Sequence, residues 1–190
     1  SVMLNQTIQL LLDIFLQGFA GVLLFRFLLQ WLRAPMRNPV GEFIMGISNF
    51  AVLRARRFIP PAWKLDSSSL VLALLVEFVY LWLTLLLGGY PFAHFPLLGL
   101  LALSAVNLFK ISIYLLMSAL VAQAILSWVN PFTPLAPLLA AITYRFLRPL
   151  QKIIPLVGNI DLSPLLLLVI CQIILLVPIV MLESLAARLL

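Results

Sequence analysis

The chain carries the same ordered set of features twice, in residues 26–77 and again in residues 123–172, about 96 positions later. Each copy begins with a polar residue deep in an apolar run and continues to a tryptophan, a proline-containing break and an arginine-bearing amphipathic stretch. Each copy then has a proline, an aspartate with a serine two residues after it, and a new apolar run with one polar residue near its middle. A repeat of this length predicts that both halves of the chain adopt the same local structure.

The apolar runs are too extensive for the core of a soluble domain. Of the 190 residues, 64% are hydrophobic and 9% are charged, and the mean hydropathy is +1.19. A soluble domain is about half apolar and about a quarter charged, whereas a helix of roughly 20 apolar residues crosses a bilayer. We therefore predict an all-α membrane protein with four transmembrane helices, at about 4–32, 69–87, 108–129 and 164–185.

The apolar stretch 92–129 is too long for one simple span. We expect a short interfacial or re-entrant piece at about 95–106, followed by the third span, and the alternative is that this piece belongs to the span. Pro178 lies inside the fourth span and should kink that helix, because proline lacks a backbone N–H donor. The two repeats then correspond to residues 1–90 and 91–190.

Between the two spans of each half lies a segment with apolar residues on one helical face and bases on the other. In 135–153 the apolar residues recur at steps of three and four, and segment 40–59 is a looser copy of this pattern. A basic amphipathic helix of this kind lies in the membrane interface, and the alternative is a soluble helix that docks on a partner. The bases expected to contact lipid or a partner are Arg54, Arg56, Arg57, Arg145, Arg148 and Lys152.

The positions of the bases also predict the orientation of the chain. The two segments between paired spans are rich in Lys and Arg, whereas the N-terminal tail and the turn near Pro91 have neither. The positive-inside rule therefore places both amphipathic segments in the cytoplasm and both termini in the periplasm, with the halves arranged as parallel repeats. The net charge of +6 lies mainly in these segments and suits anionic lipid, so nucleic acid is not an expected partner. The chain begins without a basic region or a small-residue cleavage site, so we expect no cleaved signal peptide.

Asp13, Arg26, Glu77 and Lys110 are potentially charged and lie within the predicted spans, where each costs on the order of 3 kcal/mol at the bilayer centre. Their formal charges cancel, so we expect them to pair. Where the first copy has a base and an acid, the second copy has two amides, as a direct contact between the two positions would require. The predicted contacts are Arg26 with Glu77, Gln123 with Gln172 and, between the halves, Asp13 with Lys110.

These intramembrane residues allow two functional interpretations. They can form a proton or ion pathway, or they can hold a compact bundle together, and their compensated charges favour the second interpretation. Asp66, Asp161 and Ser163 precede apolar runs and are predicted helix N-caps. The sequence has no cluster of metal ligands, no glycine-rich phosphate loop and no nucleophile beside a histidine. We therefore expect no cofactor, no metal and no enzymatic activity.

Specific motifs in both halves match a known family. In the first half they are Arg26, Gln30-Trp31, Asn38-Pro39, Arg56-Arg57-Phe58-Ile59-Pro60 and Asp66. In the second half they are Ile125-Leu126-Ser127-Trp128, Arg148-Pro149-Leu150-Gln151-Lys152-Ile153-Ile154-Pro155 and Gly158-Asn159-Ile160-Asp161-Leu162-Ser163-Pro164. Through these motifs the chain resembles the YggT family of bacterial inner-membrane proteins, which is related to the YlmG/Ycf19 proteins of cyanobacteria and plastids.

The resemblance implies a multi-pass protein of the bacterial inner membrane with two copies of the module. Roles proposed for the family are assembly of membrane complexes, organisation of the envelope, and osmotic or ion homeostasis. Together with the cytoplasmic bases, this favours a non-enzymatic scaffold or assembly factor that binds anionic lipid, other membrane proteins or a second copy of itself. The alternative is a small transporter or channel subunit that uses the intramembrane charges.

Overall fold

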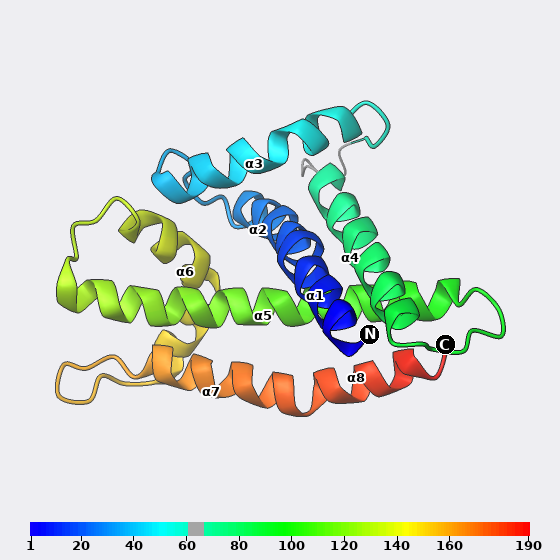
Figure 1. Cartoon of the computed structure of the whole chain (residues 1–190). Helices are drawn as coiled ribbons and strands as arrows, with labels where there is room; N and C mark the ends of the chain where they lie inside the picture. Colours follow the sequence, from blue (N-terminus) through cyan, green and yellow to red (C-terminus); the bar gives the residue numbers. More distant parts are fainter. Residues whose placement is uncertain (61–66) are drawn as a thin grey trace.

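The computed structural model describes residues 1–60 and 67–190, and this part of the chain is helical apart from turns and one isolated β-bridge, between Val157 and Ile160. The elements are α1 (Val2–Leu12), the π-helix η1 (Asp13–Gln17), α2 (Gly18–Trp31), α3 (Pro39–Ala55), α4 (Ser67–Leu87), α5 (Leu97–Val129), α6 (Ala136–Ile153), α7 (Ser163–Leu176) and α8 (Pro178–Ala187). The helix α1–α2 packs beside α4, and α5 packs beside α7 and α8, with the two pairs crossing at an angle (Figure 1).

Four helices of the described chain are long and apolar enough to cross a membrane, so the protein is a multi-pass membrane protein. They are Val2–Trp31, in which α1, η1 and α2 are continuous, then Ser67–Leu87, Leu97–Val129 and Ser163–Ala187. Long uninterrupted apolar runs form helices in lipid because only the helix satisfies every backbone N–H and C=O within one segment. The four spans predicted from the sequence are therefore confirmed.

The separate interfacial piece predicted at 95–106 is wrong, because residues 97–129 form a single helix of 33 residues. The first turns contain no proline, and Ser104 keeps its hydroxyl within the helix by donating to the carbonyl of Leu100 at 2.7 Å. Gly99 lies against the backbone of Leu189, so these turns pack on the end of α8. At 1.5 Å per residue the helix is about 50 Å long. It therefore exceeds the roughly 30 Å hydrocarbon core and must tilt or extend beyond it.

The kink predicted at Pro178 is present as a break between α7 and α8. Val177 separates the two helices and has a φ of −116° and a ψ of −72°, outside the range of regular helix. Pro178 has no N–H to donate to the preceding turn, so α7 ends before it and a new helix begins at the proline. Both helices still contact α5, so the break redirects the fourth span without detaching it.

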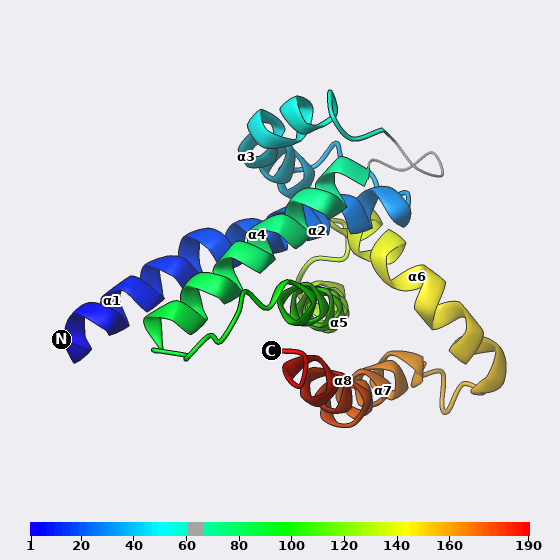
Figure 2. The same cartoon turned by 90° about the vertical axis from the view of Figure 1, so that its right-hand side faces the viewer.

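The helices α3 and α6 connect the spans within each half. α3 lies across the ends of α2 and α4 (Figure 1), whereas α6 runs from the end of α5 towards the start of α7 (Figure 2). α3 begins at Pro39 because Asn38 caps it, accepting a hydrogen bond from the N–H of Gly41 at 2.8 Å. α6 buries Leu138 and Ile142 and leaves its bases exposed.

Two hydrophobic clusters hold the helices together. The larger cluster joins α2 to α5, α6, α7 and α8 through buried residues that include Leu29, Leu138 and Ile179. The smaller cluster joins α2 to α3, α4 and α5 and includes Leu23 and Val52, which are fully buried. Helices α2 and α5 contribute to both clusters, so these two spans bind the halves of the protein to each other.

Two glycines of α3 allow a matched test of how closely this helix approaches the preceding loop. A Cβ on Gly41 would collide with the backbone of Met36, whereas a Cβ on Gly46 would meet no atom within 4 Å. We expect Gly41→Ala to destabilise the protein by about 1–3 kcal/mol through overpacking. Gly46→Ala should stabilise it by up to about 1 kcal/mol through helix propensity. Thermal unfolding in detergent micelles measures both effects, and equal shifts for the two variants would contradict this packing.

Candidate functional site

A group of polar side chains occupies the interior of the bundle between α4, η1 and α5. Glu77 of α4 is fully buried and accepts a hydrogen bond from the side-chain nitrogen of Asn107, on α5, at 3.1 Å. Gln17 of η1 has its amide against the same carboxylate. With its nitrogen facing Glu77, as the hydrogen bonds require, it donates to both oxygens at 2.7 and 3.1 Å. The Glu77 carboxylate is thus held by two amides that come from different helices.

The π-helix η1 places two polar residues of the first span against α4. Gln17 lies at its end and contacts Glu77. Asp13 lies at its start and accepts hydrogen bonds from the hydroxyl of Tyr80, on α4, and from the side-chain nitrogen of Gln9. A π-helical turn widens the helix locally and shifts the direction of the side chains that follow, and such turns are frequent at functional sites.

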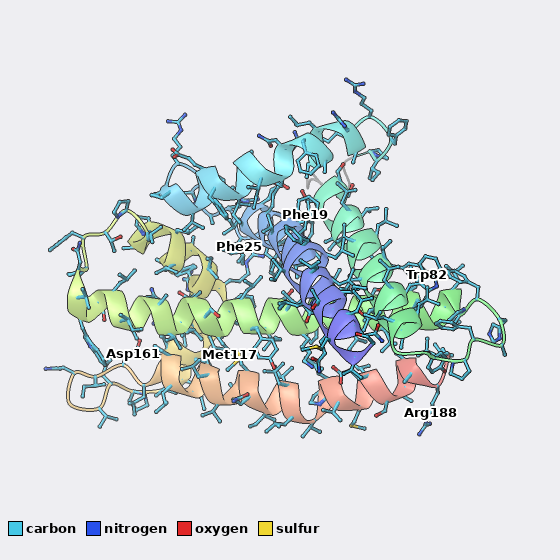
Figure 3. All side chains as sticks on the ribbon, in the orientation of Figure 1. Phe19, Phe25, Trp82, Met117, Asp161 and Arg188 are labelled. Atoms are coloured by element: carbon cyan, nitrogen blue, oxygen red, sulfur yellow. The ribbon has the colours of Figure 1, made fainter. Side chains whose placement is uncertain are left out.

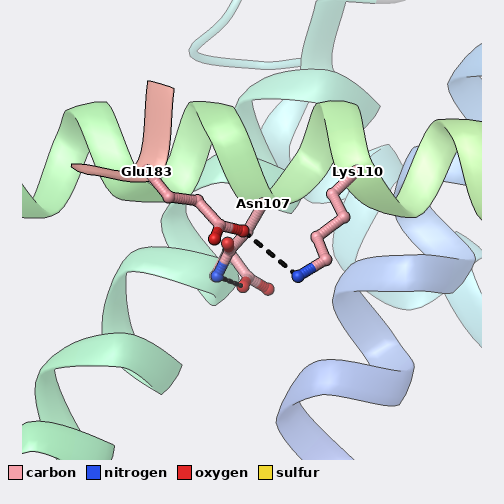
Figure 4. Close-up of polar contacts among 4 residues, drawn as sticks. Asn107, Lys110 and Glu183 are labelled. Atoms are coloured by element: carbon pink, nitrogen blue, oxygen red, sulfur yellow. Dashed lines mark hydrogen bonds and ion pairs between the residues drawn. The ribbon is translucent and has the colours of Figure 1, made fainter. Parts of the chain in front are cut away.

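An ion pair joins α5 to α8 close to this group. The ammonium nitrogen of Lys110 lies 3.1 Å from the carboxylate of Glu183, and the two side chains are 38% and 32% exposed. Lys110 lies one turn from Asn107 along α5, so both residues present side chains to the same region (Figure 4). The Asp13–Lys110 contact predicted from the sequence is therefore wrong. Lys110 pairs with Glu183 instead, within the second half of the chain.

The predicted contact of Arg26 with Glu77 is also wrong. Arg26 is buried on α2, and its guanidinium donates to the hydroxyl of Ser48 and to the side-chain oxygen of Asn49, each at 2.8 Å. Both acceptors lie on α3, which approaches α2 closely enough to reach a residue inside the span. Arg26 is therefore bound by the connecting helix, while Glu77 faces α5 and η1.

The second half repeats this arrangement with an amide in place of the guanidinium. Gln123 of α5 accepts a hydrogen bond at 3.0 Å from the hydroxyl of Thr143, which lies on α6. Its predicted partner, Gln172, is on the exposed face of α7, so the expected contact between the two amides is not formed. In both halves the polar residue of the first span meets a hydroxyl of the connecting helix.

The predicted helix caps differ in their outcome. Asp161 accepts a hydrogen bond from the backbone N–H of Ser163 at 2.9 Å and one from the side chain of Gln151 at 3.0 Å. The N–H of Ser163 stabilises the charged form and lowers the pKa of the Asp161 carboxyl. Ser163 is the first residue of α7 and follows the N-cap position, which Leu162 occupies, so Ser163 is not the cap. Asp66 lies outside the described residues.

The bases of the connecting helices lie at the surface. Arg54, Arg56 and Arg57 are exposed at the end of α3. On α6, the guanidinium of Arg145 lies 4.5 Å above the ring of Trp31, and Arg148 donates to the hydroxyl of Tyr144. The described parts of the chain contain no group of three or more His, Cys, Asp or Glu residues that could hold a metal ion.

A known protein family matches each half of the chain separately. A model of the CCB3/YggT family matches residues 5–87 and, a second time, residues 102–182. The chain belongs to the CCB3/YggT family. An uncharacterized protein of Pseudomonas aeruginosa is 34% identical over 145 residues, which cover 75% of this chain and 73% of the relative.

Two further relatives extend the match. The uncharacterized protein YggT of Escherichia coli K12 is 27% identical over 169 residues, which cover 88% of this chain and 87% of the relative. An uncharacterized protein of Vibrio alginolyticus is 33% identical over 153 residues, covering 78% of this chain and 80% of the relative. No solved structure matches the chain.

The pairing of Lys110 can be tested with two double-mutant cycles that share one residue. We expect Lys110→Met and Glu183→Gln to couple by about 0.5–3 kcal/mol, because each single change leaves its partner uncompensated in the membrane. The cycle of Lys110→Met with Asp13→Asn should be additive to within about 0.5 kcal/mol. Unfolding by titration with a denaturing detergent in mixed micelles measures both cycles. Additivity in the first cycle with coupling in the second would contradict the observed pair.

Proposed function

We propose that this protein is a non-enzymatic scaffold or assembly factor of the bacterial inner membrane, which binds partner proteins or anionic lipid through α3 and α6. The observation that supports this proposal is the set of bases on the exposed side of the connecting helices. On α6, none of Arg145, Arg148 and Lys152 forms an ion pair with any described carboxylate. Three uncompensated bases on one helix at the end of the spans suit an anionic surface.

The apolar residues of α3 support an interfacial position for this helix. Phe43 and Phe50 are each 62% exposed, and Arg54 and Arg57 are exposed near the end of the same helix. A helix that presents large apolar side chains together with bases lies in the interface, where the apolar groups enter the acyl boundary and the charges meet head groups. The same surface in water would be an apolar patch that a partner protein covers.

We place α3 and α6 on the cytoplasmic side and both termini in the periplasm, with the halves as parallel repeats. The positive-inside rule supports this orientation, because the bases of the connecting segments lie at the same ends of their paired spans. The contacts of Arg26 with Ser48 and of Gln123 with Thr143 support the repeats, since each tethers a connecting helix to the span before it. Matching the family model twice supports the same division.

A transporter or channel subunit is the second candidate function. The group around Glu77 favours it, because a buried carboxylate inside a span is a common element of ion and proton pathways. The contacts of these carboxylates favour the scaffold. Two amides bind the carboxylate of Glu77, and the carboxylate of Glu183 forms an ion pair with Lys110. Ion flux in proteoliposomes that is robust and is lost on Glu77→Gln would replace the scaffold proposal with this one.

The scaffold proposal predicts that partner recruitment depends on the bases of the connecting helices. Proteins co-purified with the full chain in mild detergent can be quantified by mass spectrometry for the wild type, Arg54→Gln/Arg57→Gln and Arg145→Gln/Arg148→Gln. We expect each double variant to lose its specific partners several-fold, because rim charges set association with complementary surfaces. Arg188→Gln is the control. This exposed base lies beyond α8, and Asp161 lies at the other end of the fourth span (Figure 3). Identical partner sets for all four proteins would contradict the proposal.

A further inference from the structure

We propose that α2, α5 and α6 form a binding site for a single anionic phospholipid. Its phosphate contacts the bases of α6, and one acyl chain lies in the groove between α2 and α5. This inference rests on the proposed contact of α6 with anionic lipid and assigns that contact to a defined site. Two adjoining cavities carry the argument, one apolar and one basic.

The apolar cavity has a volume of about 250 Å³ and lies among the three helices. Phe25 and Leu28 of α2, Phe109 and Leu116 of α5, and Phe146 of α6 are part of its lining. Ser112 is the polar residue of the lining, and its hydroxyl donates to the carbonyl of Leu108 at 2.9 Å within α5. The apolar cavity therefore offers hydrocarbon contact, and its lining hydroxyl already has a hydrogen-bond acceptor. Both properties suit an acyl chain.

The basic cavity has a volume of about 600 Å³ and lies on the exposed side of α6. Arg145, Arg148 and Lys152 line it together with Tyr144, and its lining contains no Asp or Glu. The three bases are spaced three and four residues apart, so they share one face of the helix. Two guanidinium groups and an ammonium group around one cavity match the several oxygens of a phosphate diester.

The two cavities meet at the end of α2. Leu32 lines both of them, and the guanidinium of Arg145 lies 4.5 Å above the ring of Trp31, which lines the apolar cavity. The Trp31 ring also contacts Phe146, at 6.4 Å between ring centroids. From Leu32 to Phe25 the groove follows seven residues of α2, or roughly 10 Å, into the hydrocarbon region.

The junction of charge and groove selects the ligand class. A free phosphate would use the bases and leave the groove empty, whereas a neutral apolar molecule would use the groove and leave three bases uncompensated. A phospholipid with an anionic head group carries charge and hydrocarbon in adjoining parts of one molecule, as the two adjoining cavities require. Tryptophan at the boundary is typical of the level at which head groups meet acyl chains.

Native mass spectrometry of the full chain in detergent can test the site with three probes. These are dimyristoyl phosphatidylglycerol, dimyristoyl phosphatidylcholine with the same chains, and glycerol 3-phosphate without chains. We expect phosphatidylglycerol to bind on the order of tenfold or more tightly than phosphatidylcholine, because three bases attract the anionic head group. Glycerol 3-phosphate at the same concentration should not displace the phosphatidylglycerol, because it leaves the groove unfilled.

Two variants divide the site into its parts. Arg145→Gln/Arg148→Gln/Lys152→Gln should reduce the affinity for phosphatidylglycerol to that for phosphatidylcholine. Ser112→Leu enlarges a side chain that lines the groove and should weaken both lipids. Arg37→Gln/Arg188→Gln removes two exposed bases that line neither cavity and should keep the preference. Melting temperatures in lipid-free detergent show whether each variant is folded, and Lys152→Gln alone, at an exposed position, should give a partial loss if the triple variant unfolds.

An unchanged preference in the α6 variants, or an equal loss in the control variant, would overturn the site. So would displacement of phosphatidylglycerol by glycerol 3-phosphate, which would indicate a phosphate site alone. These results would leave the scaffold proposal standing if partner recruitment still depended on the bases, because the lipid assay contains no partner protein. Conversely, intact lipid selectivity with unchanged partner sets would refute the scaffold and retain the lipid site.

Discussion

Hydrocarbon offers no hydrogen-bond partner, so a polar side chain inside a span must find one within the protein. This constraint explains the contacts that organise the bundle. Glu77 draws η1 and α5 against α4 through two amides, and Lys110 draws α8 against α5. Apolar packing fills the space between these contacts, but lipid satisfies apolar side chains equally well. The polar contacts therefore specify which helix faces lie together, and apolar packing provides most of the contact area between the helices.

The spans could be predicted from the sequence because length and hydropathy decide whether a helix crosses a bilayer, whatever its neighbours are. The partners of the intramembrane charges could not be predicted by the same means. Charge balance and the two matching amides of the second copy suggested Arg26 with Glu77, yet amides and hydroxyls also compensate a charge in low dielectric. Glu183 could have been found, since it lies within the predicted fourth span and gives Lys110 an acid of its own half.

The depth reached by the connecting helices is the feature that the sequence pattern did not reveal. A helix with apolar residues on one face and bases on the other is predicted to lie parallel to the membrane. The same pattern does not predict that a hydroxyl of this helix contacts a span. Ser48 and Thr143 make that contact, each with the polar residue of the preceding span. They occupy equivalent positions in the two copies, 95 residues apart, so the shared element of the module is a tether between span and connecting helix.

The two copies keep this tether with different chemistry, and they differ in the charge that the contact places inside the protein. In the first copy a guanidinium lies inside the protein, where Ser48 and Asn49 of α3 bind it. In the second copy the neutral Gln123 accepts from the hydroxyl of Thr143, so this contact places no charge inside the bundle. The bases of this copy lie on α6, where Arg145, Arg148 and Lys152 line one open cavity and Arg145 lies over the Trp31 ring. The copy with the neutral internal contact is thus the one whose connecting helix gathers three bases around a single cavity.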